Sequence, residues 1–152
     1  PLAPIRRLLC ASPSYLEKNP APLYPHDLKE HRCLLYQHSR TPATWSFQKG
    51  KERISVKVPG NLFSNNGDIL LQGARAGAGL VLLPEFLVAP ALANRELEVL
   101  MTEWEDQWKA SLWALFPPHS VLSAKVRTFV DFLVESFSPR PPWDFWQTHA
   151  KH

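Results

Sequence analysis

The sequence predicts an α/β fold in which helices flank a mixed β-sheet. Three stretches support this prediction: a strand–helix–strand unit at residues 61–84, a hairpin at 44–60 and an amphipathic helix at 120–137. A helix that connects two buried strands nearly always makes a right-handed crossover between parallel strands. A hairpin pairs antiparallel strands, so the two connections together favour a mixed sheet.

The N-terminal part of the chain alternates between short strands and helical turns. In chain order these are a strand at 5–12, a short helix at 14–19, a helical turn at 26–31 and a strand at 32–37. Ser12 or Ser14 can cap the short helix, because a serine hydroxyl accepts a hydrogen bond from a first-turn amide. The connection that follows this helix contains three prolines, Pro20, Pro22 and Pro25, which favour turns and loops.

Residues 44–60 alternate apolar and polar side chains around a Lys-Gly-Lys turn. Trp45 and Phe47 precede the turn, and a second set of apolar residues follows it: Ile54, Val56 and Val58. Alternation with a period of two on both sides of a glycine-containing turn indicates a β-hairpin.

The stretch "NGDILLQGARAGAGLVLLP" at 66–84 raises the question of phosphate binding, because Gly77 and Gly79 precede an aliphatic run. Phosphate-binding loops precede a helix, where free amide N–H groups face the anion. Here the two glycines follow a helical pattern that Asn65 or Asn66 can cap, at the end where a left-handed residue stops a helix. The predicted apolar stripe of that helix is Ile69, Leu70, Gly73, Ala74 and Ala76. We therefore expect a helix stop before a buried strand, and no phosphate site.

The C-terminal half continues the pattern. It predicts a short helix at 85–92, a rim strand at 95–101, an apolar strand at 109–118, the amphipathic helix at 120–137 and a Pro/Trp-rich tail at 139–152. The expected apolar face of the long helix is Val121, Leu122, Val126, Phe129, Val130, Leu133 and Phe137. No internal repeat is present in the sequence.

Composition narrows the class of protein. The 152 residues suit one domain or two small lobes, and the net charge of +3 is spread without a basic run, which argues against a nucleic-acid-binding face. We find no helix-turn-helix pattern, no membrane-length apolar run and no full signal-peptide core, so a cytoplasmic location is expected. Cys10 and Cys33 each lie in an aliphatic stretch and are expected to be buried, unpaired strand residues.

Catalysis and metal binding have little support in the sequence. His31 and Cys33 are two residues apart, but two ligands do not make a zinc site, and a Cys–His pair would need a third, orienting group and an oxyanion hole. Trp104 and Trp108 are four residues apart and are expected to pack together on one helical face. We expect no enzyme activity, no metal and no cofactor.

The order of these elements resembles the C-terminal part of the effector-binding domain of LysR-type transcriptional regulators. The matching pieces are "RRLLCASPSYL", "PHDLKEHRCLLY", "WSF", "NLFSNNGDILLQGARAGAGLVLLPEFLV", "RELEVLMTEWE", "LWALFPP" and "SAKVRTFVDFLVESF", which follow the order seen in the family. The resemblance implies a fold like that of type 2 periplasmic binding proteins. It assigns residues 1–138 to a partial effector-binding domain, with about 11–110 as its second lobe and 111–138 as the return strand and last helix of its first lobe.

The resemblance also implies a function and a site. Effectors in this family bind between the two lobes, and small organic acids are common among them. The second-lobe wall is expected to hold residues that follow strands or start helices: Ser12, Pro13, Tyr36, Gln37, His38, Ser39, Asn65 and Asn66. A cap or loop role explains each of these residues without a ligand. The helix that starts after Asn66 would offer amide donors to a carboxylate.

The implied function is effector sensing by a regulator fragment that makes no direct DNA contact and forms a homodimer. Two alternatives stay open: a free-standing association module derived from such a regulator, and the solute-binding module of a transporter. An upstream reading frame that encodes a helix-turn-helix would separate a shortened regulator from a free-standing module. The absence of a signal peptide argues against the transporter module.

Overall fold

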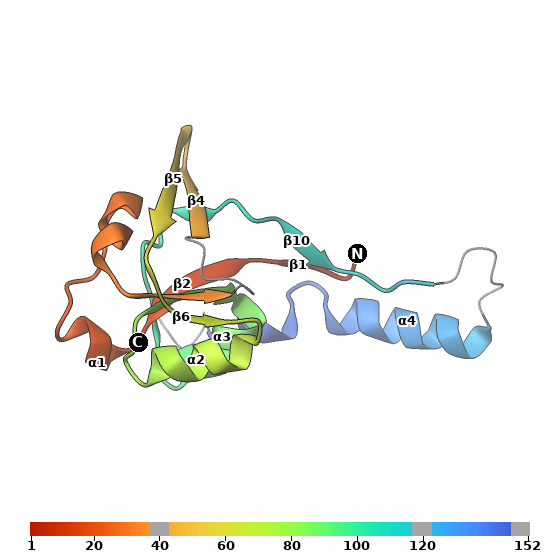
Figure 1. Cartoon of the computed structure of the whole chain (residues 1–152). Helices are drawn as coiled ribbons and strands as arrows, with labels where there is room; N and C mark the ends of the chain where they lie inside the picture. The colour runs from red at the N-terminus through yellow and green to blue at the C-terminus, as the bar shows by residue number, and fades with distance from the viewer. Residues whose placement is uncertain (37–42, 117–122, 147–152) are drawn as a thin grey trace.

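The computed structural model describes residues 1–36, 43–116 and 123–146, and a five-stranded mixed sheet lies at its centre (Figure 1). The strand order is β6–β3–β7–β2–β8. The strands are β2 (Arg7–Ala11), β3 (Cys33–Tyr36), β6 (Gly60–Ser64), β7 (Leu80–Pro84) and β8 (Glu98–Val99). β3 is parallel to β6 and to β7, whereas β2 is antiparallel to β7 and to β8. The prediction of a mixed sheet is confirmed.

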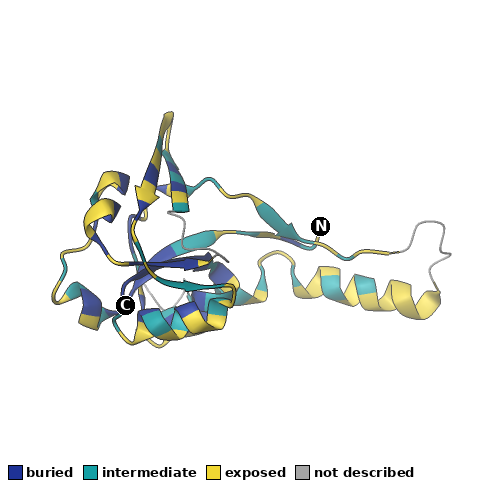
Figure 2. Cartoon of the chain, in the orientation of Figure 1, coloured by how far each residue is buried: buried dark blue, intermediate teal, exposed yellow. Residues whose placement is uncertain are grey.

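Layers of different kinds cover the two faces of this sheet. Helices α2 (Gly67–Arg75) and α3 (Glu85–Ala93) pack on one face. The other face packs on a three-stranded antiparallel sheet of order β5–β4–β9, together with α1 and the 3-10 helix η1. These elements are α1 (Pro13–Leu16), η1 (Pro25–Glu30), β4 (Ala43–Lys49), β5 (Glu52–Val58) and β9 (Glu105–Asp106). Figure 2 shows that buried residues concentrate in this layered part of the molecule.

The predicted hairpin is confirmed as β4 and β5, which pair antiparallel. Trp45 is paired with Val56, and Phe47 with Ile54. Trp45, Phe47, Val56 and Val58 are buried against the central sheet, and Ile54 is half-buried. Full burial of one such side chain contributes roughly 1.5–3 kcal/mol, so the alternating pattern fixes which face of the hairpin turns inward.

The two cysteines lie on opposite faces of the central sheet, which excludes a disulfide between them. Cys10 lies in the cluster under α2 and α3, and Cys33 lies in the cluster under the hairpin. Both thiols are free and fully buried, as expected. Burial raises the pKa of Cys10 far above its ordinary value and that of Cys33 to about 12. Neither thiol is a nucleophile in this environment, because the thiolate is the reactive form.

The glycine-rich stretch stops a helix, as predicted. Asn66 caps α2, and its Oδ1 accepts a hydrogen bond from the amide of Asp68 at 2.8 Å. Gly77 has a φ of +77° and so supplies the left-handed residue, which settles the choice between it and Gly79. The predicted stripe was correct for Leu70 and Ala74 and wrong for Ile69 and Ala76, which are exposed. The face of α2 that packs on the sheet is therefore narrower than the apolar stripe that the sequence predicted.

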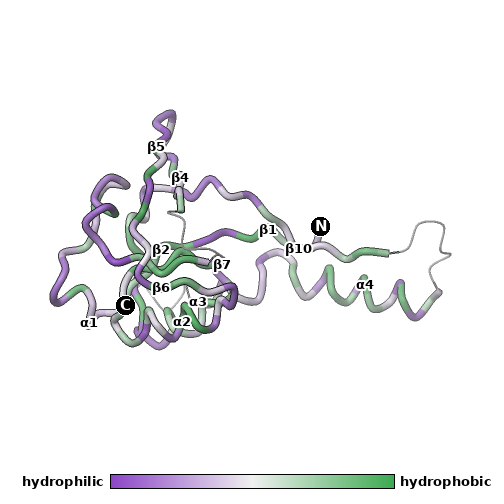
Figure 3. Tube along the Cα trace, in the orientation of Figure 1, coloured by the Kyte–Doolittle hydropathy of each residue, from purple (hydrophilic) through white to green (hydrophobic). Residues whose placement is uncertain are grey.

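A ribbon and a long helix extend from the layered body (Figure 1). β1 (Ala3–Ile5) pairs with β10 (Ala110–Leu112), and α4 (Ala124–Ser136) runs in the same region. Of the strand predicted at 109–118, only Ala110–Leu112 is a strand within the described residues. Residues 117–118 of that prediction, and Val121 and Leu122 of the predicted helix face, lie outside the described residues. No residue of α4 is buried, although Figure 3 shows that hydrophobic residues recur along it. Among the described residues, no helix is both long enough and apolar enough to span a membrane.

The prediction that Trp104 and Trp108 share a helical face is wrong. Trp104 lies in a turn just before β9 and is buried in the hairpin-side core. Trp108 lies just after β9 and stacks under the guanidinium of Arg7, with 5.1 Å between the Arg7 Cζ and the ring centroid. The spacing of four is accidental, because the segment crosses from one sheet to another and does not coil.

A buried hydrogen-bond chain joins α1 to the end of η1. The Tyr15 hydroxyl accepts a hydrogen bond from the Arg32 amide at 3.2 Å and lies 3.0 Å from Nδ1 of His31. The hydroxyl proton is thus free to be donated to an unprotonated Nδ1. Burial lowers the pKa of His31 below its ordinary value of 6.5, and the nearby Asp27 and Glu30 oppose this shift only in part.

We expect the stability of the protein to fall as the pH drops through 6.5 towards the lowered pKa of folded His31. The unfolded chain binds the proton more readily than the folded one, so this contribution is complete above pH 6.5 and is lost below it. Urea unfolding of the wild type and His31→Gln between pH 7.5 and 5 measures the difference. Identical pH profiles for the two proteins would contradict the expectation.

Candidate functional site

Polar residues lie together at one end of the central sheet, where the parallel strands end; this end is called the strand-end edge. β3, β6 and β7 are parallel, so their carboxyl ends lie at the same edge (Figure 1). Tyr36 ends β3 and is paired with Ser64, the last residue of β6. Asn65 and Asn66 follow at once and are exposed, and α2 begins there. The structure therefore brings Tyr36, Asn65 and Asn66 to one edge, in the crevice position that ligands favour in open α/β sheets.

The start of α2 is organised by short-range hydrogen bonds. The Asn66 backbone amide donates a hydrogen bond to Oγ of Ser64 at 3.0 Å, and the Asn66 side chain accepts one from the amide of Asp68. The first-turn amides have no acceptor within the helix, and the helix dipole adds partial positive charge at this end. The amides of Gly67 and Ile69 belong to the same turn, so the geometry suits a small anion between Tyr36 and the helix start.

Ser12 and Pro13 do not lie at this edge. β2 is antiparallel to its neighbour β7, with Arg7 opposite Pro84, so its carboxyl end points to the opposite side of the sheet. Ser12 is buried as the cap of α1, where its Oγ accepts from the Tyr15 amide at 3.4 Å. A shallow depression there also includes the ion pair of Arg75 with Glu96. Gln37, His38 and Ser39 lie outside the described residues.

The start of α3 lies at the same edge as the start of α2 but is already occupied. Glu85, in the first turn of α3, is 1% exposed and receives two hydrogen bonds from the Arg6 guanidinium, at 2.9 and 3.0 Å. The indole N–H of Trp146 donates to the same carboxylate at 2.8 Å, and Asp144 lies 3.8 Å from Arg6. Hydrogen bonds from Arg6 and Trp146 thus compensate the burial of this carboxylate. The start of α2 holds no buried carboxylate and is more open than the start of α3.

The Arg6–Glu85–Trp146 group was missed at the level of sequence. Its members are 61 and 79 residues apart along the chain, so no local spacing connects them. One signal was available: Glu85 directly follows a buried strand and Pro84, and a carboxylate there needs a partner once it is buried. The tail places η2 (Pro142–Phe145) against α3, where Trp143 contacts Phe86 with ring centroids 5.7 Å apart.

Comparisons with known proteins agree on one family. The family description "LysR substrate binding domain" matches residues 1–138. The HTH-type transcriptional activator TtdR of Escherichia coli (strain K12) is 38% identical over 129 residues, which are 84% of this chain and 41% of TtdR. The HTH-type transcriptional regulator DmlR of the same strain is 32% identical over 150 residues, which are 98% of this chain and 48% of DmlR. The chain thus spans less than half the length of these two curated relatives.

A solved structure shows the same fold. The regulatory domain of CrgA, a LysR-type transcriptional regulator from Neisseria meningitidis, superposes with a TM-score of 0.74 at 28% sequence identity. The superposition covers 89% of this chain and 66% of the CrgA chain. A third of that regulatory domain therefore has no counterpart in the superposition.

Proposed function

Because the chain belongs to the LysR substrate-binding domain family, we propose that its polar strand-end edge binds the small organic effector of a LysR-type transcriptional regulator. The observation that carries this proposal is the open start of α2 beside Tyr36, Asn65 and Asn66. The neighbouring helix start, that of α3, carries its own carboxylate, Glu85, which is held by side-chain hydrogen bonds from Arg6 and Trp146, so the start of α2 is the more open of the two. A carboxylate is the ligand class that fits the α2 position.

We further propose that this edge is one wall of a cleft between two lobes. Residues 11–110 would form the second lobe, and 111–138 the return strand and last helix of the first lobe. Two observations support this division: the layered body ends near residue 110, and α4 carries apolar side chains but buries none. The tail at 139–152 would hold α4 to the second lobe, since its described part packs on α3.

The proposed role is sensing without catalysis, in the cytoplasm where a regulator meets its DNA. The relatives are named as transcription regulators, and the described residues hold no group of three or more metal-ligating side chains. DNA contact would belong to another part of the regulator, since the basic residues of this chain are scattered along its sequence without a basic run. A solute-binding module on the same fold is less well supported, because the names of the curated relatives indicate regulators.

A charge introduced at the proposed edge should weaken carboxylate binding without unfolding the protein. Asn66→Asp keeps an oxygen that can cap the Asp68 amide but places a negative charge where the carboxylate would lie. We expect about tenfold weaker binding of succinate or benzoate, measured by amide shifts of Gly67, Asp68 and Ile69 in heteronuclear NMR spectra. Asn94→Asp, at the far end of α3, is the matched control. Equal loss in both variants, or ligand shifts confined to the Ser12 depression, would refute the assignment.

A further inference from the structure

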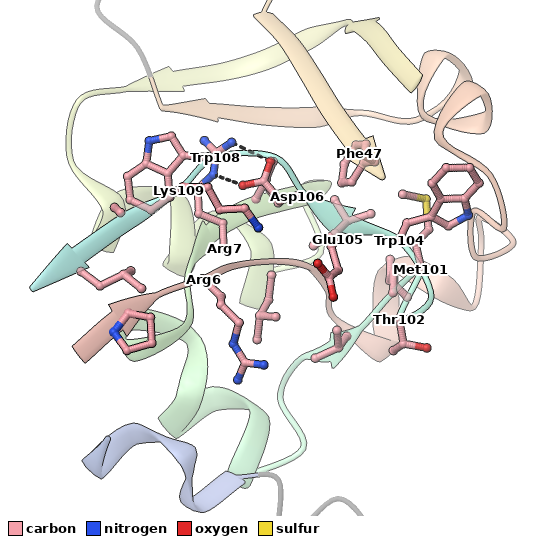
Figure 4. A pocket seen from close by; sticks show the side chains of 18 of the residues that line it. Arg6, Arg7, Phe47, Met101, Thr102, Trp104, Glu105, Asp106, Trp108 and Lys109 are labelled. Atoms are coloured by element: carbon pink, nitrogen blue, oxygen red, sulfur yellow. Dashed lines mark hydrogen bonds and ion pairs between the residues drawn. The ribbon is translucent and has the colours of Figure 1, made fainter. Parts of the chain in front are cut away.

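A second hollow lies apart from the start of α2. A cavity of about 570 Å³ lies between β2 and the segment from Val99 to Ala110 (Figure 4). Its volume falls within the range of roughly 300–1,000 Å³ typical of small-molecule sites. Leu9, Leu82 and Met101 are among its apolar lining residues, and three tryptophans contribute to it: Trp104, Trp108 and Trp146. The lining therefore suits an aromatic molecule.

The arginines beside this cavity are already paired. Figure 4 shows the side chains of Arg6, just before β2, and Arg7, its first residue, pointing in opposite directions, with Arg7 joined to Asp106 and lying beside Trp108. Arg7 makes two hydrogen bonds to the Asp106 carboxylate, at 2.7 and 2.8 Å, while Arg6 is held by Glu85. The other charged lining residues, Glu105 and Lys109, have opposite signs. A carboxylate ligand would gain little from this balanced set and would lose its hydration.

Trp146 connects the cavity to the C-terminal tail. Its ring lines the cavity, and its indole N–H is fixed by the hydrogen bond to Glu85. The tail is anchored further along by Trp143, which lies 5.6 Å from Phe137 and 5.7 Å from Phe86, measured between ring centroids. A wall of the cavity is thus supplied by a segment that docks from outside the sheet.

From these observations we propose that the cavity is a second ligand site, separate from the α2 edge, that binds a neutral planar aromatic molecule, and that Trp146 forms its closing wall. Aromatic rings stack favourably on indoles in offset or edge-to-face geometry, and the thioether of Met101 adds a soft contact. Neutrality of the ligand follows from the pairing of both arginines. The site goes beyond the proposed effector edge, which is polar and suits a carboxylate.

Benzyl alcohol and benzoate form a matched pair of probes, because they differ mainly in charge. We expect benzyl alcohol to shift the indole N–H resonances of Trp104 and Trp146 saturably, and benzoate to leave them in place while it shifts the amides of Gly67 to Ile69. The two readouts separate the two sites, so failure of one proposal does not imply failure of the other. Absence of a saturable indole shift, or equal indole shifts with both probes, would overturn the cavity proposal.

Variants locate the ligand and test the closing wall. Thr102→Phe and Ala110→Phe each place a ring in the cavity from a different segment, and either should weaken benzyl alcohol binding about tenfold or more. Trp146→Ala should weaken it about three- to tenfold, whereas Trp113→Ala, an exposed residue beyond β10, should not change it. Thermal melts identify a variant that fails to fold. If one cavity-filling variant does not fold, the binding of benzyl alcohol to the other one tests the proposal. Unchanged binding in a folded filling variant, or equal effects of the two tryptophan variants, would contradict the proposal.

Discussion

The Gly79→Ala variant is expected to lose about 2–3 kcal/mol of unfolding free energy, because a side-chain carbon at this position would overlap backbone. A Cβ on Gly79 would fall against the carbonyl group of Arg32. That carbonyl accepts a hydrogen bond from the Leu80 amide at 2.8 Å, where β3 and β7 begin to pair. Backbone cannot rotate away as a side chain can, so the two central strands would have to separate locally.

The expected cost at Gly79 exceeds that at Gly77, although of these two glycines only Gly77 has a left-handed backbone. Gly77→Ala should cost about 1 kcal/mol from that conformation. Its Cβ would lie 3.0 Å from Oγ of Ser14, an exposed side chain that can move. Gly50→Ala is the control, since Gly50 has a φ of +59° and no heavy atom within 4 Å of the added carbon. Urea unfolding of the three variants ranks them, and a Gly79→Ala cost no larger than that of Gly77→Ala would show that the sheet absorbs the overlap.

The glycine pair illustrates which features were predictable from the sequence. A helix stop, a buried strand and a hairpin are local features, and composition and spacing over about ten residues define them. The sequence therefore predicted α2, β7 and the β4–β5 hairpin. It could not separate the roles of Gly77 and Gly79, because the second role depends on Arg32, which is far away along the chain. The likeness in element order, and not any single motif, identified the family.

The candidate site was only partly predictable for a related reason. Residues that follow strands were predicted to form one wall. Tyr36, Asn65 and Asn66 do lie at the same end of the sheet, because β3 and β6 are parallel. Ser12 lies at the opposite end, since β2 runs antiparallel to β7, and this direction is set by the path of the whole chain. Strand direction is a property of the global topology, and hydrophobic patterns do not encode it.

The extended arrangement of α4 makes self-association of the 152-residue chain the second large expected effect. Val126, Phe129 and Phe132 on this helix are 39%, 59% and 60% exposed, and Leu115 beyond β10 is 86% exposed. Each large apolar side chain left in water forgoes roughly 1.5–3 kcal/mol, whereas a whole domain is stable by only about 5–15 kcal/mol. The β1–β10 ribbon has two strands, too few to be stable alone, and open edges recruit further chains.

A second copy of the chain can cover this surface, most simply around a twofold axis and by exchange of the last strand and helix. Light scattering across a tenfold dilution should therefore give at least twice the monomer mass of 17.3 kDa. Phe129→Glu combined with Phe132→Glu should shift the chain towards monomer, because both charges would be buried in the shared interface. Arg127→Glu, an exposed and already charged position on the same helix, is the control. A monomeric wild type with a cooperative melt would refute self-association, since it would mean that the layered body and the tail fold stably while α4 stays in water.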